Sequence, residues 1–237
     1  MRYAIYYTPT VADPLSRAAS SWLGTDIFGG EPAPWSPSAA MGEDERRHLI
    51  AAPSRYGFHA TLKAPFTLTE GMNEAALIDA FDRLAEAAAP IYLGPLDVTR
   101  LDGFYALRPR TQSHGLNEFA FRVVKWFEPF RSLPTAEELA RRRKVGLTPR
   151  QDALLIHWGY PFVGDEFRFH MTLTGQVEEG ARARVGRYLE QAFGPLAEDN
   201  TLLDSIVLVA ESEPEAPFTV IRQAELGVIT SERRMEA

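Results

Sequence analysis

Apolar and polar residues follow one another along the chain in patterns that predict both strands and helices. Residues 3–8 alternate in the manner of a strand, and residues 13–23 predict a short helix with Asp13 as its N-cap. Residues 25–54 are rich in glycine and proline, apart from a charged run at residues 43–50 that is compatible with one or two helical turns. So long a segment without regular structure is typical of a lid or of a wall beside a substrate.

The rest of the chain continues as helices and strands in a repeated order. Strands are expected at residues 55–64, 91–99, 104–108, 166–174, 203–210 and 217–223, and helices at residues 74–88, 116–130 and 180–193. Two capping boxes, Thr135-x-x-Glu138 and Thr148-x-x-Gln151, add two helices within an inserted segment at residues 132–165. Each half of the chain therefore runs through a helix, a strand, a helix and two strands, which suggests an internal duplication of an α+β unit.

Composition places the chain among ordinary water-soluble globular proteins. Of its 237 residues, 45% are hydrophobic and 24% are charged, so a substantial core can be buried without covalent cross-links. Cysteine is absent, which excludes disulfides, a thiolate nucleophile and zinc sites that use cysteine. Any nucleophile or proton donor must therefore come from other side chains.

The net charge and the amino-terminal sequence indicate where in the cell the protein is expected and which classes of partner it could bind. The chain begins directly with a strand-like segment and has neither a signal-peptide pattern nor an apolar stretch of membrane-spanning length, so we expect a cytoplasmic protein with no membrane partner. A formal net charge of −7 argues against a broad basic surface for nucleic acid. A small phosphorylated substrate in a local basic pocket remains compatible with this charge.

Two short runs, HATL at residues 59–62 and HMTL at residues 170–173, share the form His-x-Thr. One such triplet is expected by chance roughly 0.3 times in this chain, whereas two with flanking apolar residues are expected less than about 0.1 times. Tyr56 and Phe58 would fall on the buried face of the first strand. Side chains two apart on a strand point the same way, so the exposed faces of the two strands would carry Arg55, His59, Thr61 and Lys63, and Arg168, His170 and Thr172.

In these two runs the chain resembles the two-histidine (2H) phosphoesterase superfamily, and the likeness covers most of its length. The longer runs RYGFHATLKAPF at residues 55–66 and FHMTLTG at residues 169–175 are similar to one branch, which is encoded with bacterial phosphonate-utilisation genes. The resemblance implies a single bilobal α+β domain over residues 1–237, in which two pseudo-symmetric lobes of antiparallel sheet, with helices on the outer faces, enclose a central groove. The lobes would comprise approximately residues 1–112 and 113–237, with exchange of a strand between them allowed.

Two histidines that face one another suit the hydrolysis of a phosphodiester. One imidazole can take a proton from water while the other gives a proton to the departing oxygen, because the unperturbed pKa of histidine, ~6.5, makes both forms accessible. The threonine hydroxyls can donate hydrogen bonds to the phosphate oxygens as negative charge builds up. No metal and no cofactor is expected, since no spacing typical of a metal site is present. We therefore assign catalysis to His59, Thr61, His170 and Thr172, and substrate binding to Arg55, Lys63, Arg168 and Tyr6.

Each of these assignments has a simpler alternative. The two histidines could be structural residues satisfied within a sheet, and the threonines could be ordinary strand formers. The three basic side chains assigned to substrate could be solvated charges on strand edges, and Tyr6 could belong to the core. The basic run at residues 141–144 could contact RNA or could be a solvated helix end. The other histidines, His48, His114 and His157, lack a threonine partner and are expected at the surface or at helix ends.

The sequence thus predicts an enzyme that hydrolyses a small cyclic phosphodiester, and the resemblance to the phosphonate-associated branch makes a phosphoribosyl cyclic phosphate the candidate substrate. Processing of 2′,3′-cyclic phosphate ends of RNA is the first alternative, although such enzymes usually present a basic, aromatic channel. A module that binds a phosphosugar or a nucleotide without turnover is the second. The identity of the base, the regiochemistry of the product and the oligomeric state are left open.

Overall fold

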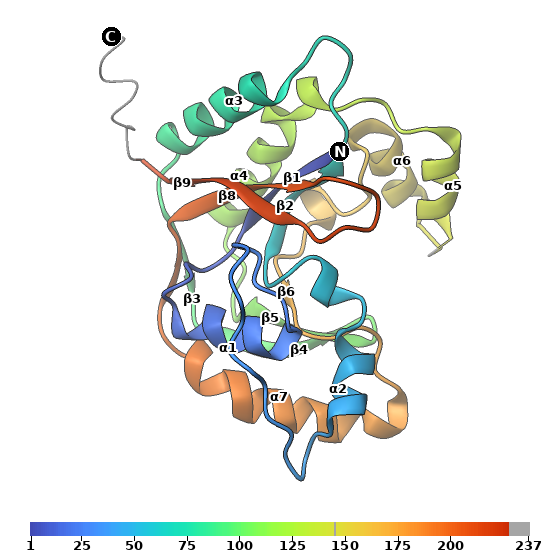
Figure 1. Cartoon of the computed structure of the whole chain (residues 1–237). Coiled ribbons are helices and arrows are strands. Elements are labelled where there is room, and N and C mark those ends of the chain that lie inside the picture. The colour runs from blue at the N-terminus through green and yellow to red at the C-terminus, as the bar shows by residue number, and fades with distance from the viewer. Residues whose placement is uncertain (145, 228–237) are drawn as a thin grey trace.

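The computed structural model describes residues 1–144 and 146–227 as an α+β fold (Figure 1). The predicted domain also includes residues 145 and 228–237, which lie outside those described. The strands are β1 (Arg2–Tyr7), β2 (Ala60–Phe66), β3 (Ile91–Gly94), β4 (Leu96–Leu101), β5 (Phe104–Pro109), β6 (Met171–Thr172), β7 (Thr201–Leu203), β8 (Ser205–Glu211) and β9 (Thr219–Glu225). The α-helices are α1 (Pro14–Leu23), α2 (Glu43–Ile50), α3 (Glu74–Glu86), α4 (His114–Trp126), α5 (Ala136–Arg143), α6 (Pro149–Trp158) and α7 (Arg182–Ala197). Short 3-10 helices are η1 (Pro53–Arg55), η2 (Glu128–Phe130), η3 (Gly164–Glu166) and η4 (Glu179–Ala181). Within the described ranges no helix is both long and apolar enough to cross a membrane.

Each of the antiparallel sheets combines strands from the two halves of the sequence. The largest has the order β2-β1-β8-β9, with β1 and β8 paired at its centre. A three-stranded sheet has the order β4-β5-β6, and β3 pairs with β7 in a third, two-stranded sheet. Figure 1 shows the four-stranded sheet in the upper part of the view and the three-stranded sheet below it. The later part of the chain therefore completes sheets that the earlier part began.

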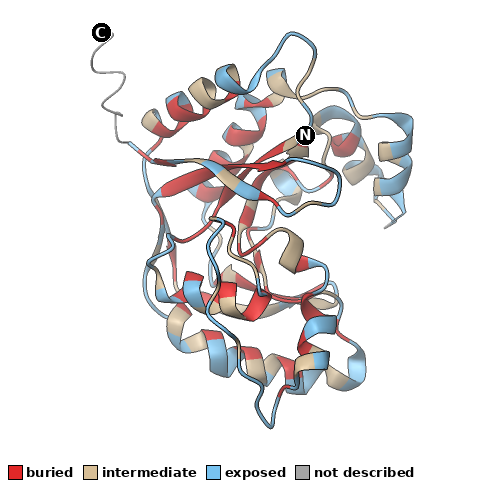
Figure 2. Cartoon of the chain, in the orientation of Figure 1, coloured by how far each residue is buried: buried red, intermediate tan, exposed pale blue. Residues whose placement is uncertain are grey.

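The two central strands of the four-stranded sheet, β1 and β8, are buried on both faces. Ile5 and Tyr7 of β1 point into the main core, where α3 and α4 pack against this sheet. Tyr6, which alternates with them, points to the other face and packs under Ile27 and Phe218. Figure 2 shows the strands of this sheet largely in the colour of buried residues. Burial on both faces explains why β1 is almost continuously apolar rather than strictly alternating.

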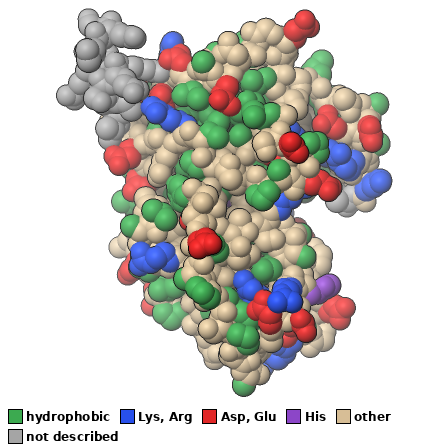
Figure 3. Space-filling model, viewed as in Figure 1, with side chains coloured by type: hydrophobic (Ala, Val, Ile, Leu, Met, Phe, Trp, Pro, Cys, Tyr) green, Lys and Arg blue, Asp and Glu red, His purple; other side chains and the backbone are tan. Residues whose placement is uncertain are grey.

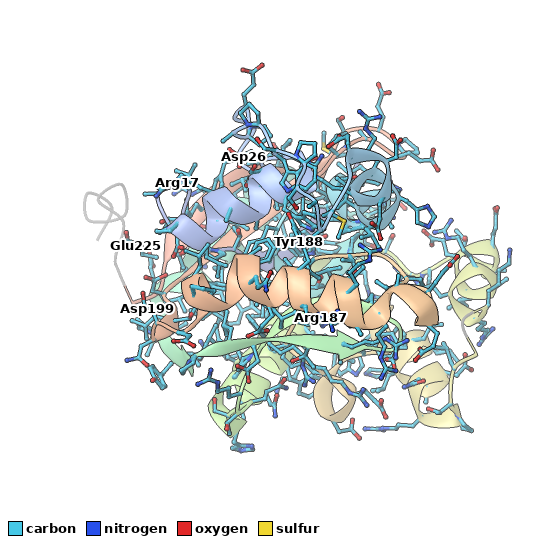
Figure 4. All side chains as sticks on the ribbon, turned by 90° about the horizontal axis from the view of Figure 1, so that it is seen from below. Arg17, Asp26, Arg187, Tyr188, Asp199 and Glu225 are labelled. Atoms are coloured by element: carbon cyan, nitrogen blue, oxygen red, sulfur yellow. The ribbon has the colours of Figure 1, made fainter. Side chains whose placement is uncertain are left out.

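The three-stranded sheet is covered on one face by α7, which also packs against α1. Tyr105 and Leu107 of β5 and Met171 of β6 point to this side and join the main core. Tyr188 of α7 lies on the side of the helix that faces α1, and its hydroxyl accepts a hydrogen bond from Nε1 of Trp35 at 3.0 Å (Figure 4). Because side chains alternate along a strand, the intervening residues of β5 and β6 point to the opposite face.

Several element ends follow the local sequence signals. The side chain of Asp13 accepts a hydrogen bond from the backbone of Leu15 at 2.7 Å at the start of α1, and the helix ends at Gly24 with φ 69°. Both expected capping boxes are present, at the starts of α5 and α6. The charged run forms α2. Caps depend on residues only a few positions apart, so they can be predicted from the sequence.

Both predicted His-x-Thr strands are shorter than expected. The strand expected at residues 55–64 begins only at Ala60, because η1 precedes it and Gly57 takes a left-handed conformation with φ 66°. The strand expected at residues 166–174 shrinks to β6, which follows η3. Each histidine therefore stands one residue before its strand, where the backbone leaves an irregular segment.

The helix expected at residues 180–193 continues through Pro195 to Ala197. Proline cannot donate a backbone hydrogen bond, which favours a helix end at this position. The buried side chains of α7 recur every four residues on one face, and burying one large side chain contributes about 1.5–3 kcal/mol. Burial of this face therefore offsets the hydrogen bond that Pro195 cannot donate. The buried residues of the face are Val185, Leu189, Phe193 and Ala197.

Candidate active site

His59 and His170 stand at the starts of β2 and β6 in the same local geometry. The Nδ1 atom of His59 lies 3.0 Å from the carbonyl oxygen of Gly57, and Nδ1 of His170 lies 2.7 Å from the carbonyl oxygen of Arg168. Each histidine thus bonds to the residue two positions before it, so Nδ1 of the neutral ring carries the proton and donates it. Nε2 then holds the free lone pair in both rings, as a general base requires.

The two His-x-Thr strands lie side by side although they belong to different sheets. Cα atoms of β2 and β6 approach within 8 Å of one another. A pocket of about 340 Å³ opens beside them. Figure 3 shows the molecular surface hollowed between the part that holds α5 and α6 and the part that holds α2. The pocket draws on both motifs, because its lining includes His59 of the first and Thr172 of the second, together with Tyr56 and Phe104, whereas Thr61 and His170 are not part of that lining.

Aromatic rings pack against both imidazoles. Tyr6 of β1 stacks on His59, with the ring centroids 3.8 Å apart and the planes 22° apart. Phe104 of β5 lies 5.7 Å from the ring of His170, and Tyr56 lies 6.2 Å from that of His59. Such contacts restrict the rotamer of an imidazole and exclude water from its faces. Tyr6, which we expected to face the substrate with its hydroxyl, is 1% exposed and contacts His59 through its ring.

Burial keeps both histidines neutral near pH 7. It lowers the pKa of His59 to about 4, against the opposing hydrogen bond to Gly57, and the charge of His170 adds to the effect. It also lowers the pKa of His170, against its own backbone hydrogen bond, and the guanidinium of Arg108 adds to that effect. Burial raises the pKa of Tyr6 well above its ordinary value, so this phenol stays protonated. The pKa of His59 responds to the charge of His170, so the two imidazoles lie within electrostatic range of one another.

The two motif threonines lie beside the histidines with hydroxyls available for a ligand. Oγ1 of Thr61 lies 3.2 Å from Nε2 of His59, and the half-buried Thr172 lines the pocket. A hydroxyl can rotate from such a resting contact and donate a hydrogen bond to an incoming phosphate oxygen. Thr174 has a structural contact instead, since its Oγ1 accepts a hydrogen bond from the backbone of Tyr105 at 2.9 Å.

Lys63 does not share the face of Thr61, contrary to the sequence-based expectation. Thr61 pairs with Tyr6 of β1, and Lys63 pairs with the neighbouring Ile5, so one extra residue of β2 lies between the two pairs. This β-bulge turns Lys63 to the opposite face of the sheet. There its Nζ lies 2.6 Å from Oε2 of Glu128, and the residue is 2% exposed. Lys63 therefore belongs to a buried ion pair beneath α4 and is not brought to the pocket.

The two arginines assigned to substrate are not part of the pocket lining. Arg55 pairs with the buried carboxylate of Glu211, which Arg2 also binds. Its Nε lies 3.4 Å from the carbonyl oxygen of Ala216. Arg168 is exposed, and its carbonyl oxygen accepts the hydrogen bond from the second histidine. A contact between either guanidinium and the substrate stays a prediction.

Three residues near the histidines were missed by sequence reasoning. Tyr56 was assigned to the buried face of a strand, yet it precedes β2 and lines the pocket. Phe104 and Arg108 lie on β5, on the same face as Thr172 of the adjacent β6, and Phe104 contacts the ring of His170 while the charge of Arg108 acts on the pKa of His170. Alternation along β5 predicts that Phe104 and Arg108 share a face of that strand. It does not predict that β5 pairs with β6, because no local sequence pattern identifies the partner of a strand.

The other histidines lie on α2, α4 and α6, and His114 has 86% of its side chain exposed. His114 and His157 line a separate hollow of about 760 Å³ beside Phe121 and Trp158. Among residues 1–144 and 146–227, no group of three or more His, Cys, Asp or Glu side chains is arranged to hold a metal ion. His48, His114 and His157 thus lie on helices and belong to neither His-x-Thr motif.

Comparison with known proteins finds similarity along most of the chain. Residues 61–219, about two thirds of the chain, match a family described as a protein of unknown function, DUF1045. A ribose 1,5-bisphosphate phosphokinase named PhnN from Janthinobacterium sp. is 37% identical over 221 residues, which cover 92% of this chain and 49% of that protein. A protein of the same name from Laribacter hongkongensis is 37% identical over 225 residues, which cover 94% of this chain and 51% of that protein. The chain thus spans about half the length of these curated relatives.

A solved structure is also similar at the level of the chain trace. It is a crystal structure described as a conserved protein of unknown function from Agrobacterium tumefaciens. The match covers 92% of this chain and 83% of that chain, with 11% sequence identity and a TM-score of 0.41.

Proposed function

This chain belongs to the DUF1045 family, and on that premise we propose that its two His-x-Thr motifs hydrolyse a small cyclic phosphodiester without a metal. The observation that carries the proposal is a pair of imidazoles with equivalent hydrogen bonds, at the starts of two strands that lie side by side next to a pocket lined by His59 and Thr172. The chain would then be a two-histidine phosphoesterase with two lobes that face one another across a groove. The sheets that contain β2 and β6 would form the inner surfaces of those lobes.

The reaction requires that one proton be taken and one be given. His59 is neutral at physiological pH, and its Nε2 takes a proton from the water that attacks phosphorus. The phosphorus–oxygen bond of the ring breaks on the opposite side, and protonated His170 gives its Nε2 proton to the departing oxygen. Thr61 and Thr172 donate hydrogen bonds to the non-bridging oxygens as charge develops. One water is consumed, and the cyclic diester becomes a phosphate monoester and a free hydroxyl.

The lowered pKa values of both histidines predict an acidic pH optimum. Activity should rise as the pH increases through the pKa of His59, about 4, because the base must be neutral. It should fall as the pH increases through the pKa of His170, which lies below the ordinary 6.5, because the acid must be protonated. A plot of kcat/KM against pH should therefore be bell-shaped, with its maximum between about 4 and 6.5. A maximum on the alkaline side of neutrality would reject these roles.

The names of the relatives support a ribose phosphate as the substrate. Those proteins are named as kinases of ribose 1,5-bisphosphate, and they are about twice as long as the matching segment. A kinase of the P-loop type needs a G-x-x-x-x-G-K-[ST] run, which this chain lacks. We assign their kinase activity to the half that this chain does not span. Water that breaks the P–O2 bond of ribose 5-phosphate 1,2-cyclic phosphate yields ribose 1,5-bisphosphate, so this reaction would supply the kinase with its substrate.

Turnover of a panel of cyclic phosphates, with and without a chelator, tests the proposed function. We expect ribose 5-phosphate 1,2-cyclic phosphate to be hydrolysed at an unchanged rate after metal removal. An RNA with a 2′,3′-cyclic end should be a poorer substrate, because the net charge of −7 disfavours a nucleic-acid backbone. Loss of activity with the chelator would reject metal independence. Saturable binding of every compound without any product would indicate a binding module and reject the enzyme.

A further inference from the structure

Arg108 of β5 has no part in the two proposed proton transfers, yet its charge acts on the pKa of His170. Ala106 pairs with Thr172 in the ladder between β5 and β6. The ladder ends with the pair of Leu107 and Met171, and one further antiparallel step would bring Arg108 to the level of His170, just before β6 begins. Residues paired in this way project from the same face, with Cβ atoms about 5 Å apart. By alternation the side chain of Arg108 projects from the face of the sheet that carries Thr172, within electrostatic range of His170.

Arg108 lacks an anionic partner within the part of the chain that the structure describes. Its buried Nε has no hydrogen-bond partner there. Arg110, which follows the end of β5, is by contrast paired with Asp97 at 2.8 Å. A buried donor on a cation is costly when it is left unpaired, and a guanidinium bonds strongly to the oxygens of an anion. An anionic ligand could therefore supply the hydrogen-bond acceptor and the negative charge that Arg108 lacks among the described residues.

The pocket lining is mostly uncharged, whereas Arg108, at the other end of β5, is positively charged. Phe104 lines the pocket, and Arg108 lies four residues further along β5, about 13 Å away. No described residue of the pocket lining carries a formal charge apart from His59 when it is protonated. The positive charge of Arg108 acts on the pKa of His170, whereas the pKa of His59 responds to His170. Arg108 thus lies within electrostatic range of His170 and four residues along β5 from Phe104, which lines the pocket.

We propose that Arg108 binds a second anionic group of the substrate, a phosphate monoester that is separate from the cyclic diester that reacts. The cyclic diester lies between the two imidazoles, the neutral sugar ring occupies the pocket, and the monoester bonds to the guanidinium, whose planar fork matches two phosphate oxygens. This inference rests on the proposed function. It narrows the substrate class to a cyclic phosphate that carries an additional phosphate group.

Kinetics with two substrates and two variants can test whether Arg108 binds a second phosphate group of the substrate. The substrates are ribose 1,2-cyclic phosphate with and without a 5-phosphate, and the variants are Arg108→Gln and the matched control Arg110→Gln. We expect Arg108→Gln to lower kcat/KM about 10- to 100-fold for the phosphorylated substrate, the value of one charged hydrogen-bonded contact. For the unphosphorylated substrate the loss should stay below about 3-fold, and Arg110→Gln should change neither value by more than that.

An equal loss on both substrates would overturn the inference, because Arg108 would then act on the reacting phosphate or on His170. Equal rates for Arg108→Gln and the unaltered protein would overturn it as well. The binding of ribose 5-phosphate, measured by calorimetry, tests the proposed phosphate-binding position at Arg108 without any turnover. Arg108→Gln should weaken that binding at least about 10-fold, whereas an unchanged Kd rejects the subsite. Failure of the unaltered protein to hydrolyse either substrate would reject the proposed function, and the binding measurement would still decide the role of Arg108.

Discussion

Alanine in place of His59 or of His170 is expected to lower kcat by about 10²- to 10⁴-fold, the range that one general acid or base contributes. In the proposed reaction each ring carries one of the two proton transfers, and the phenol of Tyr6, which stacks on His59, cannot replace it because burial raises the pKa of that phenol. Initial rates on the cyclic substrate at its optimum pH measure the effect. The double variant should be little slower than either single variant, because residues that act as a unit give non-additive losses.

A surface histidine provides the matched control for these two variants. His114→Ala removes a side chain that is 86% exposed, and it should leave kcat within about 2-fold of the unaltered protein. Thermal unfolding followed by circular dichroism separates loss of chemistry from loss of fold. Retention of more than about a tenth of the rate in a folded His59 or His170 variant is incompatible with a proton-transfer role for that ring.

Valine in place of Thr172 is expected to lower kcat by about 10²- to 10³-fold, as does removal of one donor that stabilises a developing negative charge. Valine keeps the shape of threonine but cannot donate a hydrogen bond to the phosphate oxygen. Thr61→Val should give a loss of similar size, because Thr61 stands in the same position relative to His59. The loss should appear in kcat, since the hydrogen bond strengthens as charge builds up in the transition state.

Serine restores the hydroxyl and therefore tests whether the donor is responsible. Thr172→Ser should recover activity to within about 10-fold of the unaltered protein. Thr219→Val, on an exposed position of β9, controls for the change of a strand threonine to valine. Equal rates for the serine and valine variants of Thr172 would show that its hydroxyl takes no part in the reaction.

The parts of the fold that depend on neighbouring residues could be predicted from the sequence. Asp13 and the capping boxes at Thr135 and Thr148 mark helix starts because their hydrogen bonds span only two or three residues. The pairing of β1 with β8, or of β5 with β6, joins distant segments, and alternation along each strand does not identify its partner. Pro195 shows the converse, since a local stop signal is overruled by burial of the last turn of α7.

The same distinction applies to the candidate site. His59 and His170 could be found from the sequence because the motif repeats, and the structure brings their strands together. Lys63 could not be placed, since one extra residue in β2 reverses its face and no residue type announces that bulge. Arg108 could not be found because its position beside His170 depends on a strand pairing between distant segments. Short-range patterns therefore identify the candidate reactive groups, whereas the pairing of distant strands determines which residues surround them.

The central claim is that His59 and His170 act on opposite sides of one phosphorus. A crystal structure of the protein with vanadate, which adopts the five-coordinate geometry of phosphorus during displacement, tests it most directly. We predict that vanadium lies between the two rings, with Nε2 of each histidine within about 3 Å of a different apical oxygen and both threonine hydroxyls on equatorial oxygens. Vanadate bound elsewhere, or held by only one of the two histidines, would contradict the account.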